Sequence, residues 1–409
     1  MTKYRQRDIY NHNKDNYQSL FRLSPSNHQK YKIITATEDD FANHINWQHE
    51  LDEMIRLIGK EGKIIIKCGN SLTHNMFSVK NYLGRRFGIE VKIEEESPLW
   101  AQKMYNKEKW SKDDYYTTTT FYIKRKNLII YQDKSWTFAI LTRGDKVEEV
   151  EKFCASVRNL DKKFEHQILI HGPKNPRYDK YQVDYVPNIE HYQKDQYSKI
   201  CNKKNEIIDV AKNQNLLICH DRYYLDKNFL SGFEEYGYDF DFLSIDIRYE
   251  EKSTWFPSYV KMSNFTHSFK WNKERFCFKK PDFPKNNALD NIFINGGLMI
   301  FKRDVVKQIR FNECHFHYQI EDVEISKEFA KYHIPARVNL LSRAFTSSNI
   351  SNTVGKDLSY QEDYICAGGT ITKRKKKNLY KRLRRILFKG IYNIISNKKL
   401  INFLEKGIF

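Results

Sequence analysis

The chain has 409 residues and a mass of 49.2 kDa, enough for two or three domains, and its 40% hydrophobic content supplies a core for each. Charged residues make up 30% of the sequence and interrupt every apolar stretch, so no segment approaches the roughly 20 apolar residues of a membrane-spanning helix. These values exclude a wholly disordered chain and predict no membrane span. The polar first 14 residues predict no signal peptide, and seven scattered cysteines without a C-x-x-C pair indicate reduced thiols, so we expect a cytoplasmic protein.

The net charge of +19 is concentrated near the C-terminal end. Residues 373–409 hold 13 Lys or Arg and one acidic residue, a net charge of +12, which leaves +7 for the first 372 residues. Leucines and isoleucines from Leu379 to Ile395 recur at helical spacing, with basic residues largely between them. This pattern predicts a basic amphipathic helix that lies on the anionic inner face of the cell membrane. The alternative is a helix docked on the protein's own core; nucleic-acid binding is not expected, because no aromatic residues interleave with the basic run 373–377.

The N-terminal part of the sequence predicts a polar arm followed by an α/β layer. Residues 1–30 are rich in Asn, Gln and Tyr and show no periodicity, so we expect a loose arm. From Tyr31 strands alternate with helices. The expected strands cover 32–36, 63–67, 89–93 and 116–124, and the expected helices cover about 39–58 and 75–87.

Residues 31–127 resemble the C-terminal half of a class I methyltransferase. The likeness rests on His49-Glu50-Leu51-Asp52-Glu53-Met54, GKEGKIIIKCGNS and YYTTTTFYIKR. No glycine-rich loop precedes the region, and that loop is what lets a backbone approach S-adenosylmethionine. The resemblance therefore implies a partial Rossmann-like half-domain without catalytic activity, which serves as a scaffold or a docking surface.

A second α/β unit is predicted for residues 133–370. It opens with the apolar strand 136–142, a helix over 147–159, a strand over 165–170 and a turn at Gly172-Pro173. This order is typical of nucleotide-binding folds, whose ligands lie at the carboxyl ends of the strands. The later elements are a helix over about 197–213, a strand over 216–219, and the segments DFLSIDIRY, NIFINGGLMIFKRDVVKQI and YQIEDVEISKEFAKYHI, with an aromatic-rich loop at 255–283.

Three segments of this unit carry candidate chemistry. Asp221 ends an apolar strand, where a carboxylate is costly without a metal ion or a hydrogen-bond network, although a cap or turn is the ordinary role of such a residue. Asn295-Gly296-Gly297 precedes the apolar strand 298–301 and lets the backbone approach a bulky ligand, or else forms a β-bulge. The pair Glu321-Asp322 opens an amphipathic helix, where it can cap the helix or act as a base toward a sugar hydroxyl.

Together, in this order and spacing, the segments resemble the GT-A glycosyltransferases, specifically the family 2-like group of bacterial surface-glycan enzymes. The likeness covers about residues 135–341, through LTRGD, KKNEIIDVAKNQNLLICHDRYYL, INGGLMIFKRD and IEDVEISKEF. It implies a nucleotide-sugar donor and an acceptor that is a glycan or a lipid-linked glycan. By this resemblance the donor-binding residues are Thr142, Asp145, Lys204, Asn205, His220, Asp221 and Arg222, the acceptor-binding residues are Asn295, Gly296 and Gly297, and the catalytic base is Asp322 or else Glu321.

The resemblance also implies a divalent cation, Mn²⁺ or Mg²⁺, with Asp221 as its ligand. The motif here is His220-Asp221-Arg222 instead of Asp-x-Asp, so this segment offers one carboxylate, and Arg222 could itself neutralise diphosphate charge. The segment 336–348 contains no further histidine ligand. The run Cys314-His315-Phe316-His317 has no nearby fourth ligand, which favours an aromatic acceptor wall over a metal site.

The implied reaction is a single displacement with inversion at the anomeric carbon. Asp322 removes the acceptor proton, and the nucleoside diphosphate leaves with its charge held at Asp221 and by Arg222 or Lys204. The competing class is a non-catalytic membrane-surface or nucleic-acid binding protein that acts through the basic tail. That class does not explain why three candidate segments all fall at strand or helix ends. An active methyltransferase is excluded by the missing glycine-rich loop.

Overall fold

The computed structural model describes residues 9–12, 25–44, 46–69, 75–87, 91–95, 99–109, 111, 114, 116–125, 131–160, 165–187, 199–251, 256, 259–261, 292–314 and 321–348. All of them belong to the first of two compact units, which spans residues 1–350. The predicted tail 373–409 and most of the predicted loop 255–283 lie outside the described residues.

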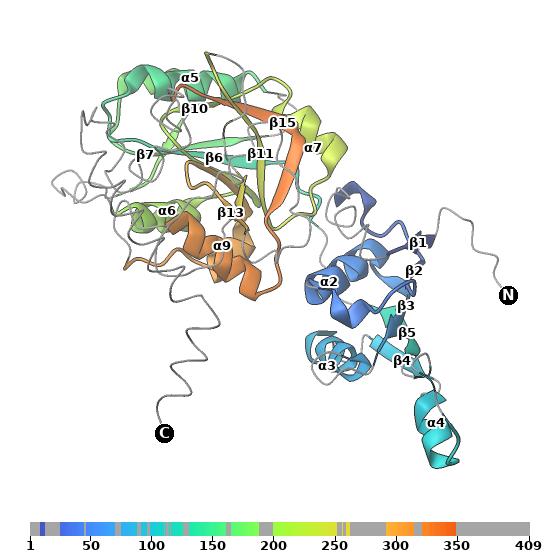
Figure 1. Ribbon diagram of the computed structural model, residues 1–409. Coiled ribbons are helices and arrows are strands. Elements are labelled where there is room, and N and C mark those ends of the chain that lie inside the picture. Colours follow the sequence, from blue (N-terminus) through green and yellow to red (C-terminus); the bar gives the residue numbers. More distant parts are fainter. Residues whose placement is uncertain are drawn as a thin grey trace, which may run out of the picture. The chain divides into compact units, whose positions relative to one another are not determined.

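The first sheet has five strands in the order β1-β2-β3-β5-β4 (Figure 1). Strands β1 (Ile9–Asn11), β2 (Ile33–Ala36) and β3 (Glu61–Cys68) are parallel neighbours. Strand β5 (Thr117–Lys124) pairs antiparallel with both β3 and β4 (Val91–Glu95). The mixed α/β character expected for residues 31–127 is therefore present.

Helices pack on this sheet through their apolar residues. Helix α2 (Trp47–Ile58) buries Leu51, Met54 and Ile55 against β2 and β3, and α3 (Met76–Phe87) adds Val79 and Leu83 to the same core. The single helix predicted over 39–58 is instead divided into a 3-10 turn, η3 (Phe41–Asn43), and α2. A short helix α4 (Leu99–Tyr105) was not predicted.

The prediction of a loose arm over residues 1–30 was wrong at two places. Strand β1 pairs with β2, with Tyr10 opposite Ile34, and the His12 amide donates to the Thr35 carbonyl at 2.7 Å. A 3-10 turn, η2, covers Pro25–Asn27. A three-residue strand is too short to show the alternation of apolar and polar residues by which strands are recognised in a sequence.

The second sheet has eight strands in the order β10-β15-β11-β14-β9-β6-β7-β8. Strands β9, β6, β7 and β8 are parallel neighbours, whereas β14 lies antiparallel between β9 and β11. The bounds are β6 (Trp136–Leu141), β7 (Gln167–His171), β8 (Asp184–Tyr185), β9 (Asn215–His220), β10 (Tyr223–Leu225), β11 (Phe242–Tyr249), β14 (Leu298–Lys302) and β15 (Arg337–Thr346). Strands β12 (Tyr259–Lys261) and β13 (Ile292–Ile294) form a separate antiparallel pair.

Helices cover both faces of the second sheet, with α5 on one side and α6 and α9 on the other (Figure 1). Ile207 of α6 and Phe329 of α9 share one buried cluster with Met299 of β14. The helices and turns are α5 (Val147–Arg158), η6 (Pro176–Tyr181), α6 (Ile200–Val210), α7 (Phe229–Tyr236), α8 (Arg303–Gln308) and α9 (Glu321–Lys331). The helices predicted at 147–159 and 197–213 thus correspond to α5 and to a shorter α6.

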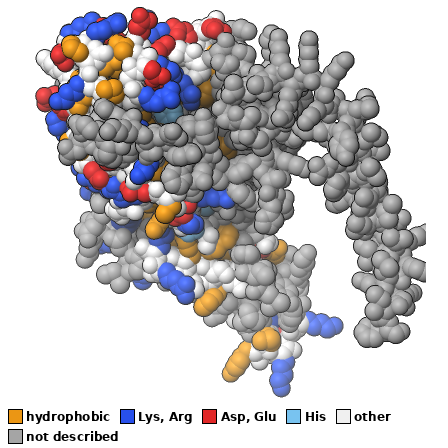
Figure 2. All heavy atoms as spheres, turned by 90° about the vertical axis from the view of Figure 1, so that its left-hand side faces the viewer, with side chains coloured by type: hydrophobic (Ala, Val, Ile, Leu, Met, Phe, Trp, Pro, Cys, Tyr) orange, Lys and Arg blue, Asp and Glu red, His pale blue; other side chains and the backbone are white. Residues whose placement is uncertain are grey.

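Charged side chains of both signs are interspersed on the described part of the face that Figure 2 presents. Within the described ranges, no helix combines the length and the apolar composition that a membrane crossing requires.

Candidate active site

Two parallel neighbours of the second sheet, β6 and β9, end side by side, with Leu141 opposite His220. The next residues, Thr142 and Asp221, therefore emerge from the same edge of the sheet. The Thr142 hydroxyl donates to Asp221 Oδ2 at 3.0 Å, and Lys146 Nζ lies 3.1 Å from Asp221 Oδ1. Both carboxylate oxygens are thus held, and the side chain stays 13% exposed.

The loop after β6 owes its shape to Gly144. This residue has a φ of +90°, a conformation that side chains disfavour, and its amide donates to Thr142 Oγ1 at 3.0 Å. The turn directs Lys146 toward Asp221. Asp145 pairs instead with Arg143 at 3.0 Å, where both side chains are well exposed.

A second group of polar side chains surrounds the buried amine of Lys204 on α6. Lys204 Nζ donates to the Gly296 carbonyl at 3.1 Å and lies 3.4 Å from Glu321 Oε1. A side chain at position 296 would collide with this group, because a Cβ there would lie 2.8 Å from Glu321 Oε1. Glycine at this position is therefore what allows the strand to approach Lys204 and the start of α9.

Asp322 follows Glu321 in the first turn of helix α9. Its carboxylate accepts hydrogen bonds from the Gly296 amide at 3.0 Å and the Val323 amide at 2.9 Å. Burial, and next the negative charge of Glu321, raise the pKa of Asp322 to about 7. A carboxylate with such a pKa is suited to take a proton near neutral pH.

The two groups are joined through neighbouring strands. The His220 amide donates to the Gly297 carbonyl at 3.0 Å, and β9 and β14 continue as partners from Cys219 opposite Leu298. Gly297 is also tightly enclosed, since a Cβ there would lie 2.3 Å from the Tyr223 hydroxyl oxygen. Asp221 therefore follows the residue bonded to Gly297, and Asp322 binds the amide of the neighbouring Gly296.

Some of the predicted site residues serve the fold through their polar atoms. The Asn205 amide binds the Phe311 backbone in both directions, at 2.9 and 3.1 Å, and donates to Glu313 at 2.8 Å. We therefore leave Asn205 out of the donor site. The Asn295 side chain accepts from the Gly297 amide at 3.0 Å, which shapes its own turn.

The backbone around Arg222 is bound to its neighbours: its amide donates to His220 O at 2.8 Å, and its carbonyl accepts from Ser347. In the run 314–317, Cys314 is exposed and the other three residues lie outside the described residues.

Sequence reasoning missed Lys146 and Tyr223. Lys146 directly follows LTRGD, and its role depends on the Gly144 turn, which the residue order alone does not define. Tyr223 is fully buried against Gly297. Its place directly after the His220-Asp221-Arg222 motif was the available signal.

The residues around Asp221 fit a divalent cation whose remaining coordination positions are filled by the substrate. Magnesium is commonly bound by one or two carboxylates together with substrate phosphates, and Asp221 supplies one carboxylate at a partly open edge. Among the described residues, three side chains able to bind a metal converge elsewhere, at His12, His44 and Glu50.

No protein-family model matches the chain, and no curated protein matches it. Among solved structures, the chain is similar to S. aureus TarS 1–349, with 12% identity and a TM-score of 0.32, covering 56% of this chain and 62% of that one. GalNAc-T7 with UDP, GalNAc and Mn²⁺ is similar at 12% identity and a TM-score of 0.38, covering 56% and 47%. The mannosyltransferase PcManGT from Pyrobaculum calidifontis, in complex with GDP-Man and Mn²⁺, is similar at 10% identity and a TM-score of 0.35, covering 62% of this chain and 65% of that one.

These neighbours are GT-A glycosyltransferases. The chain spans less than two thirds of the length of each of these three structures. A likeness at this level carries no substrate and no residue role over to the present chain.

Proposed function

We propose that the chain is a glycosyltransferase of the GT-A type, which moves a sugar from a nucleotide-sugar donor to a hydroxyl of a growing surface polysaccharide or lipid-linked glycan. The observation that carries the proposal is the hydrogen bond from the His220 amide to the Gly297 carbonyl. It joins the end of the strand that Asp221 follows to the glycine pair, and the amide of the neighbouring Gly296 donates to Asp322.

Asp221, Thr142 and Lys146 form the donor end of the proposed site. A diphosphate is an anion with several acceptor oxygens, so the Lys146 ammonium and the Thr142 hydroxyl are suitable donors to it. A divalent cation bound to Asp221 would offset the charge that builds on the leaving diphosphate. In the structure Lys146 is paired with Asp221.

Asp322 is the proposed base. Its carboxylate removes the proton of the acceptor hydroxyl while that oxygen attacks the anomeric carbon, and the bond between this carbon and the diphosphate oxygen breaks. The electron pair of that bond leaves with the nucleoside diphosphate, and the proton stays on Asp322. One attack from the opposite face inverts the configuration at the anomeric carbon.

Lys204 and Glu321 position the base in this scheme. Lys204 is fully buried, and its contacts with the Gly296 carbonyl and with Glu321 hold the glycine strand against the start of α9. Burial, and next the negative charge of Glu321, raise the pKa of Asp322, so the base is protonated when the pH falls below about 7.

The acceptor side is assigned to the backbone of Asn295, Gly296 and Gly297. We also propose that the acceptor is a growing surface polysaccharide or lipid-linked glycan. The proposal further includes attachment to the membrane through residues 373–409 and a location at its inner face. A tethered enzyme would gain effective concentration toward lipid-linked acceptors at that face.

The direct test is a panel of UDP-, GDP-, dTDP- and CMP-sugars, scored by thermal stabilisation and by slow donor hydrolysis, with and without Mn²⁺ or Mg²⁺. RNA and S-adenosylmethionine are the controls. We expect one nucleotide class to stabilise the chain and to be hydrolysed. Stabilisation by RNA alone, with no response to any nucleotide sugar, would instead favour the non-catalytic binding protein.

A further inference from the structure

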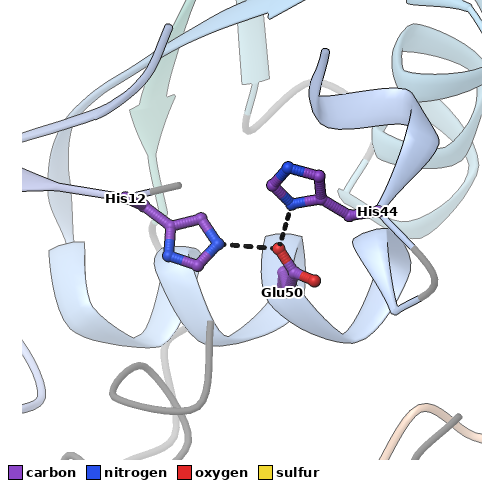
Figure 3. A group of neighbouring side chains, drawn as sticks. All are labelled: His12, His44 and Glu50. Carbon is purple, nitrogen blue, oxygen red and sulfur yellow. Dashed lines mark hydrogen bonds and ion pairs between the residues drawn. The ribbon is translucent and has the colours of Figure 1, made fainter. Parts of the chain in front are cut away.

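Three buried side chains from separate segments meet in the N-terminal layer, outside the proposed active site. His12 follows β1, His44 follows η3, and Glu50 lies in the first turn of α2. Figure 3 shows both imidazole rings turned toward the Glu50 carboxylate. The three side chains lie in buried positions, with His12 and Glu50 each 1% exposed.

Both histidines present a ring nitrogen to the same carboxylate oxygen. His12 Nε2 lies 2.7 Å and His44 Nδ1 lies 2.8 Å from Glu50 Oε2. The three ligand atoms lie within 4.8 Å of one another. Two nitrogen atoms and one carboxylate oxygen that converge in this way form a donor set that zinc accepts.

The outer contact of His44 is also that of a metal ligand. The other nitrogen of His44, Nε2, lies 2.9 Å from Asp39 Oδ1. A carboxylate on the remote nitrogen of a histidine ligand fixes the orientation of the ring and raises its basicity. Among the described residues, His12 Nδ1 is buried without a hydrogen-bond partner. The other ring nitrogen of His12, Nε2, is the one that faces Glu50.

We propose that His12, His44 and Glu50 form a structural Zn²⁺ site that fastens β1 to helix α2. Tetrahedral zinc with bonds of about 2.0–2.1 Å separates its ligand atoms by roughly 3.3 Å. To admit the ion, each imidazole nitrogen would move about 0.5 Å away from the Glu50 oxygen, and the two imidazole nitrogens, now within 4.8 Å of each other, would settle at the same separation. A water molecule completes the fourth position.

The location explains what such an ion would contribute. Strand β1 has three residues and pairs along one edge with β2, so its own hydrogen bonds hold it weakly. A metal ion bound by residues 12, 44 and 50 connects the end of β1 to helix α2. Binding energy of a structural zinc ion then becomes folding energy of the layer.

The test uses the full-length chain, purified without chelator and analysed for metal by mass spectrometry. We expect about one Zn²⁺ per chain, and a fall in melting temperature when a chelator removes it. Replacement of zinc by Co²⁺ should give the intense visible absorption of a four-coordinate N,O site without a thiolate charge-transfer band.

Variants at the ligands make the assignment specific. His12→Gln and His44→Gln should each lower zinc affinity roughly 100-fold, and Asp39→Asn roughly 10-fold. His49→Gln is the matched control, because His49 neighbours Glu50 on α2 but contacts His333 instead, and it should keep the metal. Asp221→Asn should also keep it, which separates this site from the donor site.

Two results would overturn the proposal. One is a chain that holds no zinc and whose melting temperature does not respond to Zn²⁺, which would make the cluster a hydrogen-bonded triad. The other is equal loss of zinc from His49→Gln and the ligand variants. If a ligand variant fails to fold, the Co²⁺ spectrum of the unmodified chain still decides the matter.

Discussion

Two carboxylates of the molecule, Glu53 in the N-terminal layer and Asp322 beside the second sheet, meet opposite electrostatic surroundings. Burial alone would raise the pKa of Glu53, but the Arg337 guanidinium and the His28 imidazole outweigh it and lower that pKa to about 2. Burial and the charge of Glu321 instead raise the pKa of Asp322 to about 7. A carboxylate whose cationic partners outweigh the cost of burial stabilises the fold, whereas one for which burial and a like charge outweigh a nearby cation, here Lys204, is available for proton transfer.

The largest effect should follow from removing the charge of Glu53, the carboxylate whose pKa its cationic partners lower. Glu53→Gln leaves the Arg337 guanidinium buried without its negative partner, which costs about 3–5 kcal/mol of unfolding free energy at neutral pH. Denaturant unfolding measures it. Because the folded pKa of Glu53 lies below its usual value of 4.5, the pair stabilises the protein above pH 4.5, and the difference between variant and wild type should shrink as the pH falls toward 2.

The exposed pair of Lys134 and Glu234, at 2.5 Å, provides the control for Glu53. Glu234→Gln should change the unfolding free energy by less than about 1 kcal/mol. Equal losses from the two variants would show that the buried pair does not stabilise the protein more than a surface pair.

Removing the charge of Asp322, whose pKa is raised, should affect turnover instead of stability. Asp322→Asn keeps an acceptor for the Gly296 and Val323 amides but loses the base, so we expect turnover to fall by about 100-fold or more with donor affinity nearly unchanged. Steady-state kinetics with the donor found in the panel measures it. Asp304→Asn, at the start of α8, is the matched control and should keep normal turnover; equal losses would remove the assignment of the base.

A third carboxylate, Asp221, pairs with a cation at a partly open edge of the sheet, because its partner Lys146 is 43% exposed. Asp221→Asn should lower donor affinity by roughly 10–100-fold and abolish its dependence on Mn²⁺ or Mg²⁺. Calorimetry with the nucleoside diphosphate measures both. If affinity and metal dependence do not change, Lys146 and Arg222 neutralise the diphosphate and no metal acts at this position.

The roles of these carboxylates could be predicted from the sequence only in part. The sequence predicted that Asp221 follows an apolar strand and that the glycine pair precedes another, as β9 and β14 show, because apolar runs and the residues beside them are local features. The partner of Glu53, Arg337, is 284 positions away, and the sequence contains no local trace of that contact. The same limit applies to β1, whose three residues pair with a strand more than twenty positions later.

The contacts that a side chain makes also cannot be predicted from the sequence alone. Asn205 follows Lys204 on the same helix, and the two residues were predicted to share one role. The fold separates them, since Lys204 turns toward Gly296 while Asn205 binds the backbone of Phe311. Adjacent positions on a helix point about 100° apart, so neighbours in the sequence need not share a site.

The smallest effect should come from shifting the pKa of Asp322 without removing its carboxylate. Glu321→Gln withdraws the negative charge that raises the pKa of Asp322 and leaves the Lys204 ammonium without its neighbouring carboxylate. Both changes favour the ionised form of Asp322, so its pKa should fall by roughly one unit. In the wild type, kcat/KM should fall as the pH drops below about 7, because the base becomes protonated. In Glu321→Gln this acid limb should move to lower pH, whereas Glu324→Gln, one turn along α9, should leave it in place. A limb that stays near pH 7 in Glu321→Gln would mean that the titrating group is not Asp322, because no other change to that carboxylate's surroundings would cancel the loss of a charge beside it.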